Sequence, residues 1–253
     1  MERKDVTYAA EDIEALLKSG ALTRLGMGTR RVCYALPGGM FCMKCYRSDD
    51  EISEGINFGG EIKPLRSSVV REIRQNRFSD KRNTSCIEWR YHRELLATMP
   101  KELLEVFPER MERIYLPTYG WCLVETIIAN FDGTAVRPVA DEIRRLSAQG
   151  ATYADLARAV ALIKALSPLF DMLADAAVRF YDPPNVIVQW TGPETFRLRI
   201  ADLEPRARTV VSLDRWFDFC ARFKCRRRYK RFLRSLWPEM ARLKACVKDI
   251  GKV

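Results

Sequence analysis

The sequence predicts an α+β fold in which a small, strand-rich N-terminal lobe precedes a mainly helical C-terminal lobe. Three observations support this. Residues 22–47 alternate glycines with β-prone runs, which is typical of hairpins. A second β-rich run, IYLPTYGWCLVETI, leads into ETIIANFDG, whose composition is typical of a linker. Beyond it, apolar residues recur three and four positions apart, the spacing of buried helices.

The elements arrange into one domain with three sections. We expect an N-terminal helical extension over residues 1–20, with an amphipathic helix at 10–19. The sheet lobe follows over 21–126 with one main helix, and the helical lobe over 127–253. Residues 48–83 are charged and irregular, with GINFGG followed by REIRQNRFSDKR, so we expect an inserted loop plus a basic helical turn that is partly disordered or mobile.

The helical lobe contains one predicted hairpin. A long buried helix is expected from Leu156 to Leu173, perturbed by Pro168. The prolines of FYDPPNVIVQ force an extended loop before a strand, and FRLRIADLE provides the second strand. Residues 212–250 predict two or three helices with aromatic side chains inside and cations outside.

Composition narrows the functional classes. The 253 residues are 47% hydrophobic, which is enough to bury a core. The formal charge of +10 attracts anions such as nucleotides, phosphorylated sugars, anionic lipid or nucleic acid, without choosing among them. No apolar run reaches the roughly 18 to 20 residues of a membrane span, and the N-terminus is too polar for a secretory signal. We therefore expect a cytoplasmic protein without a transmembrane segment.

The eight cysteines are spread over predicted strands and helices. We expect them to be reduced and to pack as small apolar residues. Cys42 and Cys45 form a CxxC, but there is no second pair and His92 is the sole histidine. A zinc site would therefore need ligands scattered along the chain.

The first residues that suggest chemistry are Gly26 and Gly28, a GxG between two predicted strands. Glycines there let backbone amides approach a phosphate, although a GxG is also typical of an ordinary hairpin turn. Lys44 ends the apolar run FCMK that follows. A lysine on such a strand can reach the α- and β-phosphates of a nucleotide, provided that a carboxylate orients it. The alternative is an edge lysine with its head in water.

Glu88 is the candidate for the orienting carboxylate. Tyr91, His92 and Leu95 follow it at helical offsets, so the packing face of a helix lies beside it. Glu94 is the weaker alternative. A solvated glutamate is the ordinary interpretation of either residue.

Two oxygen-bearing residues flank the predicted C-terminal hairpin. Asn185 follows the proline loop, and Asp202 follows the second strand, so both should lie at one edge of the hairpin. Amide and carboxylate oxygens are ligands that Mg²⁺ accepts together with nucleotide phosphates. Each alone is also typical of a turn.

The ordered set resembles a known family. The segments LGMGTRRVCYALP, FCMKCY, VETIIANFDG, PPNVIV and RWFDFCARFKCRRRYKRF resemble the bacterial YrbL family, the PhoP regulatory network proteins, over roughly residues 20 to 235. That family is assigned to the protein-kinase-like superfamily, alongside kinases of lipopolysaccharide core sugars. The resemblance implies a bilobal protein-kinase-like fold that binds ATP and Mg²⁺.

The resemblance also assigns roles to particular residues. It implies a phosphate-binding loop at Gly26 and Gly28, a phosphate-binding lysine at Lys44 with its partner Glu88, and a linker around Glu125. It implies magnesium ligands at Asn185 and Asp202.

The chain departs from the kinase pattern where catalysis occurs. Phe180 occupies the position of the aspartate base, five residues before the metal-binding asparagine, and cannot accept a proton. Arg31 replaces the third glycine of the loop, and the glycine that follows the metal-binding aspartate is also replaced, because the sequence reads Asp202-Leu203-Glu204. Asp182 stands where a kinase carries its catalytic-loop lysine, and could act as a displaced base or as a loop cap.

Three functions follow. The first is a pseudokinase or regulatory protein whose nucleotide-bound conformation a partner protein recognises. The second is an atypical kinase that phosphorylates an anionic envelope sugar or a protein hydroxyl, with Asp182 as base. The third is a basic module for anionic lipid or nucleic acid, although we do not expect nucleic acid as the partner. It rests on cations interleaved with Phe223, Tyr229 and Phe232. These cations are Arg222, Lys224, Arg226, Arg227, Arg228, Lys230, Arg231 and Arg234.

Overall fold

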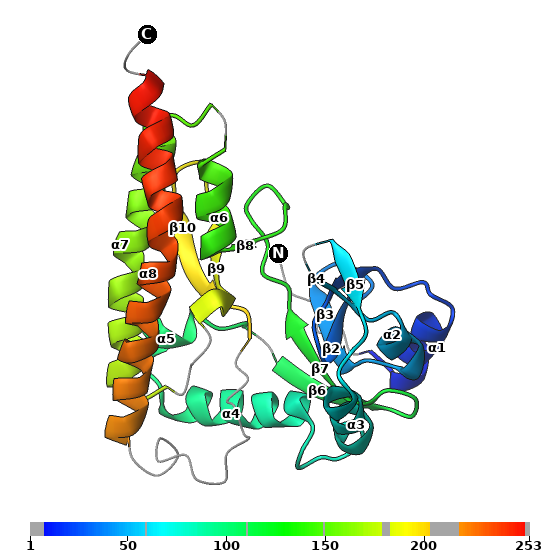
Figure 1. Cartoon of the computed structure of the whole chain (residues 1–253). Coiled ribbons are helices and arrows are strands. Elements are labelled where there is room, and N and C mark those ends of the chain that lie inside the picture. The colour runs from blue at the N-terminus through cyan, green and yellow to red at the C-terminus, as the bar shows by residue number, and fades with distance from the viewer. Residues whose placement is uncertain are drawn as a thin grey trace. The chain divides into compact units, whose positions relative to one another are not determined.

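The structure, a computed structural model, describes residues 8–58, 60–109, 111–148, 150–178, 183–202 and 218–250 (Figure 1). It has the predicted α+β composition, with a small antiparallel sheet and several helices. The chain divides into two compact units. The first contains Met1–Arg93 and Glu109–Ile127, and the second contains Glu94–Pro108 and Ile128–Val253.

A five-stranded antiparallel sheet forms the centre of the first unit, with the strand order β1-β2-β3-β7-β6. The predicted hairpins of the N-terminal stretch and the second β-rich run are confirmed. The strands are β1 (Arg24–Met27), β2 (Arg31–Ala35), β3 (Phe41–Tyr46), β6 (Met111–Leu116) and β7 (Gly120–Thr126).

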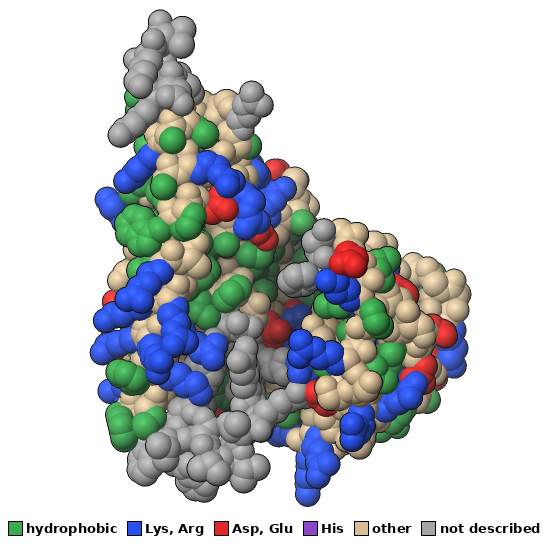
Figure 2. Space-filling view, in the orientation of Figure 1, with side chains coloured by type: hydrophobic (Ala, Val, Ile, Leu, Met, Phe, Trp, Pro, Cys, Tyr) green, Lys and Arg blue, Asp and Glu red, His purple; other side chains and the backbone are tan. Residues whose placement is uncertain are grey.

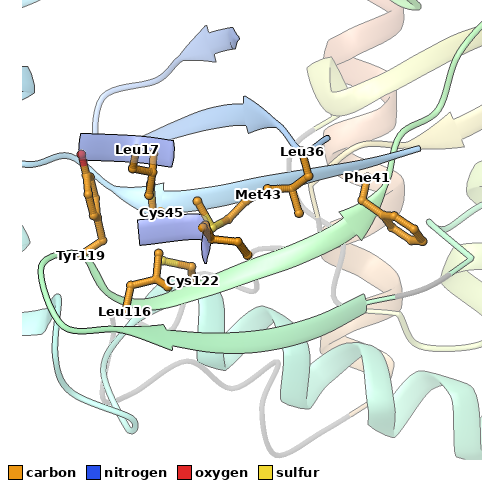
Figure 3. Packing of buried hydrophobic residues seen from close by; sticks show 9 residues of the cluster. Leu17, Leu36, Phe41, Met43, Cys45, Leu116, Tyr119 and Cys122 are labelled. Atoms are coloured by element: carbon orange, nitrogen blue, oxygen red, sulfur yellow. The ribbon is translucent and has the colours of Figure 1, made fainter. Parts of the chain in front are cut away.

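Helix α1 (Ala10–Lys18) covers one face of this sheet, as the amphipathic pattern predicts. Leu17 of α1 packs with Met43 and Cys45 of β3 and with Cys122 of β7 (Figure 3). Because side chains alternate across a strand, Lys44 of β3 must lie on the other face. The sheet therefore separates an apolar core from a face that can carry charge.

Most of residues 48–83 forms regular elements rather than the expected loop, and the expected basic helical turn is part of a helix over Ser67–Asn76. A capping box starts the first helix: the Ser48 hydroxyl accepts a hydrogen bond from the Glu51 N–H, and the Glu51 carboxylate accepts one from the Ser48 N–H. A small hairpin uses the GINFGG run. The elements are α2 (Asp49–Ser53), β4 (Ile56–Phe58), β5 (Glu61–Lys63) and α3 (Ser67–Asn76).

Arg47, at the end of β3, connects this insertion to the turn after β1. Its guanidinium is fully buried and donates hydrogen bonds to the carbonyl of Gly28 at 2.7 and 2.9 Å. It also donates to the carbonyls of Glu51 at 2.9 Å and Gly55 at 2.6 Å. A buried cation is tolerated only with such hydrogen bonds, so the turn and the insertion are held by one side chain.

Gly120, at the start of β7, contacts the end of the insertion. It has φ of +70°, and a Cβ built there would collide with the carbonyl oxygen of Arg77. The same carbonyl accepts the N–H of Trp121 at 3.2 Å. Glycine is therefore required both by the backbone conformation and by this close approach.

The second unit combines helices with the three-stranded sheet β10-β9-β8. Helix α4 (Thr84–Thr98) begins in the first unit and ends in the second. The predicted long helix and hairpin are confirmed, with Pro168 inside the helix. The elements are α5 (Lys101–Leu104), β8 (Arg137–Pro138), α6 (Val139–Leu146), α7 (Tyr153–Asp175), η1 (Pro183–Asn185), β9 (Val186–Trp190), β10 (Phe196–Ile200) and α8 (Asp218–Ile250).

Helix α8 corrects the expectation of two or three helices. It runs continuously over 33 residues beside α7 with Pro238 inside it, whereas residues 212–217 lie outside the described ranges (Figure 1). The helix continues past the proline because its buried stripe does, from Leu236 to Met240 and Leu243. No helix of the described ranges is long and apolar enough to cross a membrane.

A buried carboxylate stabilises the second unit. Glu142 of α6 accepts hydrogen bonds from Arg145 at 2.8 Å and from the Trp190 indole at 3.0 Å. Burial raises the pKa of Glu142, but these hydrogen bonds and the charges of Arg145 and Arg137 outweigh it, so the pKa lies below its usual value. Glu142 is therefore a charged group within the core.

Candidate functional site

The face of the first sheet opposite α1 carries a row of polar and charged side chains. Strand register brings them together, because residues directly opposite in an antiparallel pair point to the same face. Cys33 of β2 lies opposite Lys44 of β3, and Cys42 lies opposite Glu125 of β7. Arg31 is two residues before Cys33 on β2 and shares this face.

Lys44 and Glu125 form a buried ion pair at the centre of the row. The Lys44 Nζ lies 2.7 Å from the Glu125 Oε1, and the side chains are 14% and 7% exposed. Such a pair is a short, charge-assisted hydrogen bond. The second carboxylate oxygen of Glu125 is buried and has no hydrogen-bond partner among the described residues, so it can accept a donor from a ligand.

Glu125 was expected in the linker and instead belongs to β7. Its backbone pairs with Cys42 on one side and Met111 on the other, which fixes it as a strand residue. The chain leaves the first unit after Ile127. Strand pairing that joins residues far apart in sequence gives no local signal, although a glutamate after the apolar run CLV is unusual on a buried strand.

Glu88 is fully buried on α4, and Glu94 is exposed. The Glu88 Oε2 lies 2.7 Å from Nη1 of Arg31. The two ion pairs of the polar face thus join Glu88 to Arg31 and Lys44 to Glu125. A direct Lys44–Glu88 contact stays a prediction, and the sequence analysis missed Arg31 as a charge partner.

Gly26 and Gly28 lie at the edge of the same sheet. Gly26 pairs with Cys33, and the N–H of Gly28 donates to the carbonyl of Arg31 at 2.8 Å to close the hairpin turn. Neither glycine has a positive φ, and a Cβ at Gly26 would meet no described atom within 4 Å. Local conformation therefore does not require these glycines, and open space lies above Gly26.

Cys33 has an altered acidity within this row. A hydrogen bond from Cys42 and the charge of Lys44 outweigh burial and lower the pKa of the Cys33 thiol. The hydrogen bond to Cys33 and burial raise the pKa of Cys42 well above its usual value. Cys45, the other half of the CxxC, lies on the opposite face in the apolar core. Alternation along β3 therefore prevents Cys42 and Cys45 from acting together on one ligand.

The second unit places Asn185 and Asp202 at one end of the β9–β10 hairpin. Val186 pairs with Ile200, and the N–H of Ala201 donates to the carbonyl of Asn185 at 3.0 Å. Both side chains are partly exposed. No group of three His, Cys, Asp or Glu in the described ranges could hold a metal. These two residues suit Mg²⁺, which commonly takes one or two protein oxygens and completes its shell with phosphate and water.

Phe180 and Asp182 lie outside the described residues, so the segment that the resemblance compares with a kinase catalytic loop is not described. The chain matches no family model, no curated protein and no solved structure. This chain's own residues therefore carry the functional assignment: one unit has a polar sheet face with a buried Lys–Glu pair, and the other has a hairpin end with two oxygen-bearing side chains.

Proposed function

We propose that this chain is a protein-kinase-like, YrbL-type protein that binds ATP with Mg²⁺ and acts as a pseudokinase or regulatory protein. The observation that carries the proposal is the pair of Lys44 and Glu125 on the third and seventh strands of the first unit, 2.7 Å apart and largely buried. Protein kinases use a lysine on the third strand, oriented by a carboxylate, to contact the nucleotide phosphates.

The neighbouring residues support a nucleotide at this face. The space above Gly26 gives a phosphate or sugar access to backbone amides, which a side chain at that position would obstruct. The unpartnered oxygen of Glu125 can accept a ligand N–H or O–H. Lys44 is 14% exposed, so its ammonium can still meet a phosphate without losing Glu125.

Two features support a regulatory role over efficient phosphoryl transfer. Phe180 stands at the base position, and Arg31, which replaces the third loop glycine, is paired with Glu88 across the face. Phosphoryl transfer depends more on positioning and charge neutralisation than on the base, so slow turnover is compatible with the proposal. In the second unit, Asn185 and Asp202 are the residues that we propose to bind Mg²⁺ through their side-chain oxygens.

Nucleotide binding is testable by calorimetry and thermal unfolding with ATP, with and without Mg²⁺. A ligand at one hundred times its dissociation constant stabilises by about 2.7 kcal/mol. We expect Lys44→Met to abolish binding, and Lys63→Met, which alters an exposed lysine of β5, to leave it unchanged. If no nucleotide gives a binding heat or raises the unfolding temperature of the wild-type chain, the proposal is refuted.

Two further variants separate metal binding from catalysis. Asp202→Ala should remove the dependence of ATP binding on Mg²⁺, whereas Asp182→Ala should leave ATP binding intact. Turnover at ordinary kinase rates of about 1 to 100 per second, abolished by Asp182→Ala, would instead establish the atypical kinase with Asp182 as base.

A further inference from the structure

Helix α8 holds most of the excess charge of the chain. Residues 219–238 contain eight Lys and Arg and no Asp or Glu, so this segment contributes +8 to a net charge of +10. None of these residues belongs to the nucleotide site proposed above. The charge therefore requires its own explanation.

Three large aromatic side chains are exposed on the same helix. Phe219, Phe223 and Trp237 are 68%, 68% and 62% exposed. At 100° per residue they lie within about 40° of one another around the helix, with Lys230 and Arg234 between them on the same stripe. The stripe extends about 27 Å along the axis, at 1.5 Å per residue. Figure 2 shows Lys and Arg side chains along α8 between groups of hydrophobic side chains.

Packing explains some of the aromatic residues of α8 but not these. Phe232 is buried, and the ring of Tyr229 stacks on Phe170 of α7 at 4.8 Å. The sequence predicts that the aromatic side chains of this helix are buried, which is confirmed for Phe232 and wrong for Phe223. Phe223 and Trp237 therefore leave apolar surface of the stripe exposed.

Most cations of the stripe also lack an internal counter-charge. Arg226 pairs with Asp175 of α7 at 3.0 Å. Arg227, Lys230 and Arg234 have no acidic partner among the described residues. Uncompensated cations this close together repel one another, and an external anionic surface removes that repulsion.

We propose that this face of α8, defined by Phe219, Phe223, Arg227, Lys230, Arg234 and Trp237, docks onto an anionic lipid bilayer. A straight stripe can bring its aromatic and cationic members against a flat surface at the same time. Phe and Trp insert at the boundary between headgroups and acyl chains, and Arg and Lys neutralise anionic headgroups. The face has no Asn or Gln, the residues that commonly read base edges, so it is poorly suited to sequence recognition in nucleic acid.

Vesicle sedimentation of the full chain tests the proposal. Vesicles of phosphatidylcholine mixed with phosphatidylglycerol should bind the protein, and vesicles of phosphatidylcholine alone should bind it far less. Each cation near an anionic surface contributes about fivefold in affinity. The triple variant Arg227→Gln, Lys230→Gln, Arg234→Gln should therefore lose about 100-fold.

The matched control removes three exposed cations of the first unit, Lys18, Lys63 and Arg74, by the same change to glutamine. It should retain wild-type binding, because these residues do not belong to the stripe. Equal losses in the two triple variants would show that net charge alone attracts the vesicles, and would overturn the proposal.

The aromatic part has a separate readout. Phe223→Ala and Trp237→Ala should each weaken vesicle binding at a salt concentration that already screens the cations, and circular dichroism should show unchanged helix content. Unchanged binding of both variants would overturn the proposed insertion. Tighter binding to single-stranded oligonucleotides than to vesicles at equal phosphate concentration would assign the face to nucleic acid and refute the membrane. These vesicle-binding results do not depend on whether the chain binds ATP, so the two proposals can fail separately.

Discussion

Lys44→Met removes one member of a buried ion pair, and we expect it to lower the free energy of unfolding by about 3 kcal/mol. The two side chains are 14% and 7% exposed, so the carboxylate of Glu125 would be left charged in a site that water barely reaches. In a chain of this size each kcal/mol shifts the unfolding midpoint by about 2–4 °C. The variant should therefore melt about 6–12 °C below the wild type.

The double variant Lys44→Met, Glu125→Gln distinguishes charge balance from loss of packing. Because it removes both charges, it should recover most of the lost stability, as replacement of whole buried pairs often does. Thermal unfolding by circular dichroism compares the wild type, Lys44→Met, Glu125→Gln and the double variant. ATP binding should be absent from both variants that lack Lys44, so stability and binding are separated.

Two results would refute this reasoning. If Lys44→Met unfolds at the same temperature as the wild type, the charge of Lys44 does not compensate that of Glu125 in solution. If the double variant is as unstable as Lys44→Met, the loss comes from the methionine side chain, and the assignment of Lys44 as a charge held ready for phosphate loses its support.

Three other experiments test the structure independently. Gly120→Ala should destabilise the chain more than Gly38→Ala in urea unfolding, because both glycines have positive φ but only Gly120 abuts the Arg77 carbonyl; equal losses would contradict that contact. Because the pKa of Glu142 is lowered in the folded chain, its charge stabilises the fold at pH values above the unfolded carboxyl pKa of about 4.3. This contribution disappears as the pH falls through the pKa of the folded chain. Glu142→Gln should therefore be less stable than the wild type at neutral pH and nearly equal in acid, and a pH-independent difference would count against it. Cys33, with its lowered pKa, should be alkylated by iodoacetamide faster than buried thiols, as mass spectrometry would show, and ATP should slow that reaction; indifference to ATP would remove the nucleotide from this face.

The local elements were largely predictable because their signals are local. The apolar neighbours of Lys44 indicated a strand, and the repeat from Leu156 to Leu173 indicated a helix, and both formed. The capping box at Ser48 and Glu51 was a readable signal for α2, yet the charges and glycines of the surrounding segment predicted a loop there. In that segment the capping box predicted the structure better than the amino-acid composition did.

Partnerships across the sheet were not predictable in the same way. Glu125 meets Lys44 only because β7 inserts between β3 and β6, a choice of strand order that alternation of side chains does not encode. The predicted partner of Lys44, Glu88, is buried and forms an ion pair with Arg31, which the sequence did not indicate. Phe223 and Phe232 are nine residues apart, which at 100° per residue puts them on opposite sides of a helix, so the helical period already excludes a common core position.

The buried guanidinium of Arg47 has a thermodynamic consequence. It holds the Gly28 carbonyl with one part of its fork and the carbonyls of Glu51 and Gly55 with another, so the glycine turn and the insertion share one set of hydrogen bonds.

Linkage is reciprocal: if opening of the insertion weakens ligand binding at the turn by some factor, the bound ligand must disfavour that opening by the same factor. A partner that binds α2 would then change the affinity at the turn without contacting a ligand there. If a ligand bound at the turn slows amide hydrogen exchange in residues 49–55, that slowing measures the coupling.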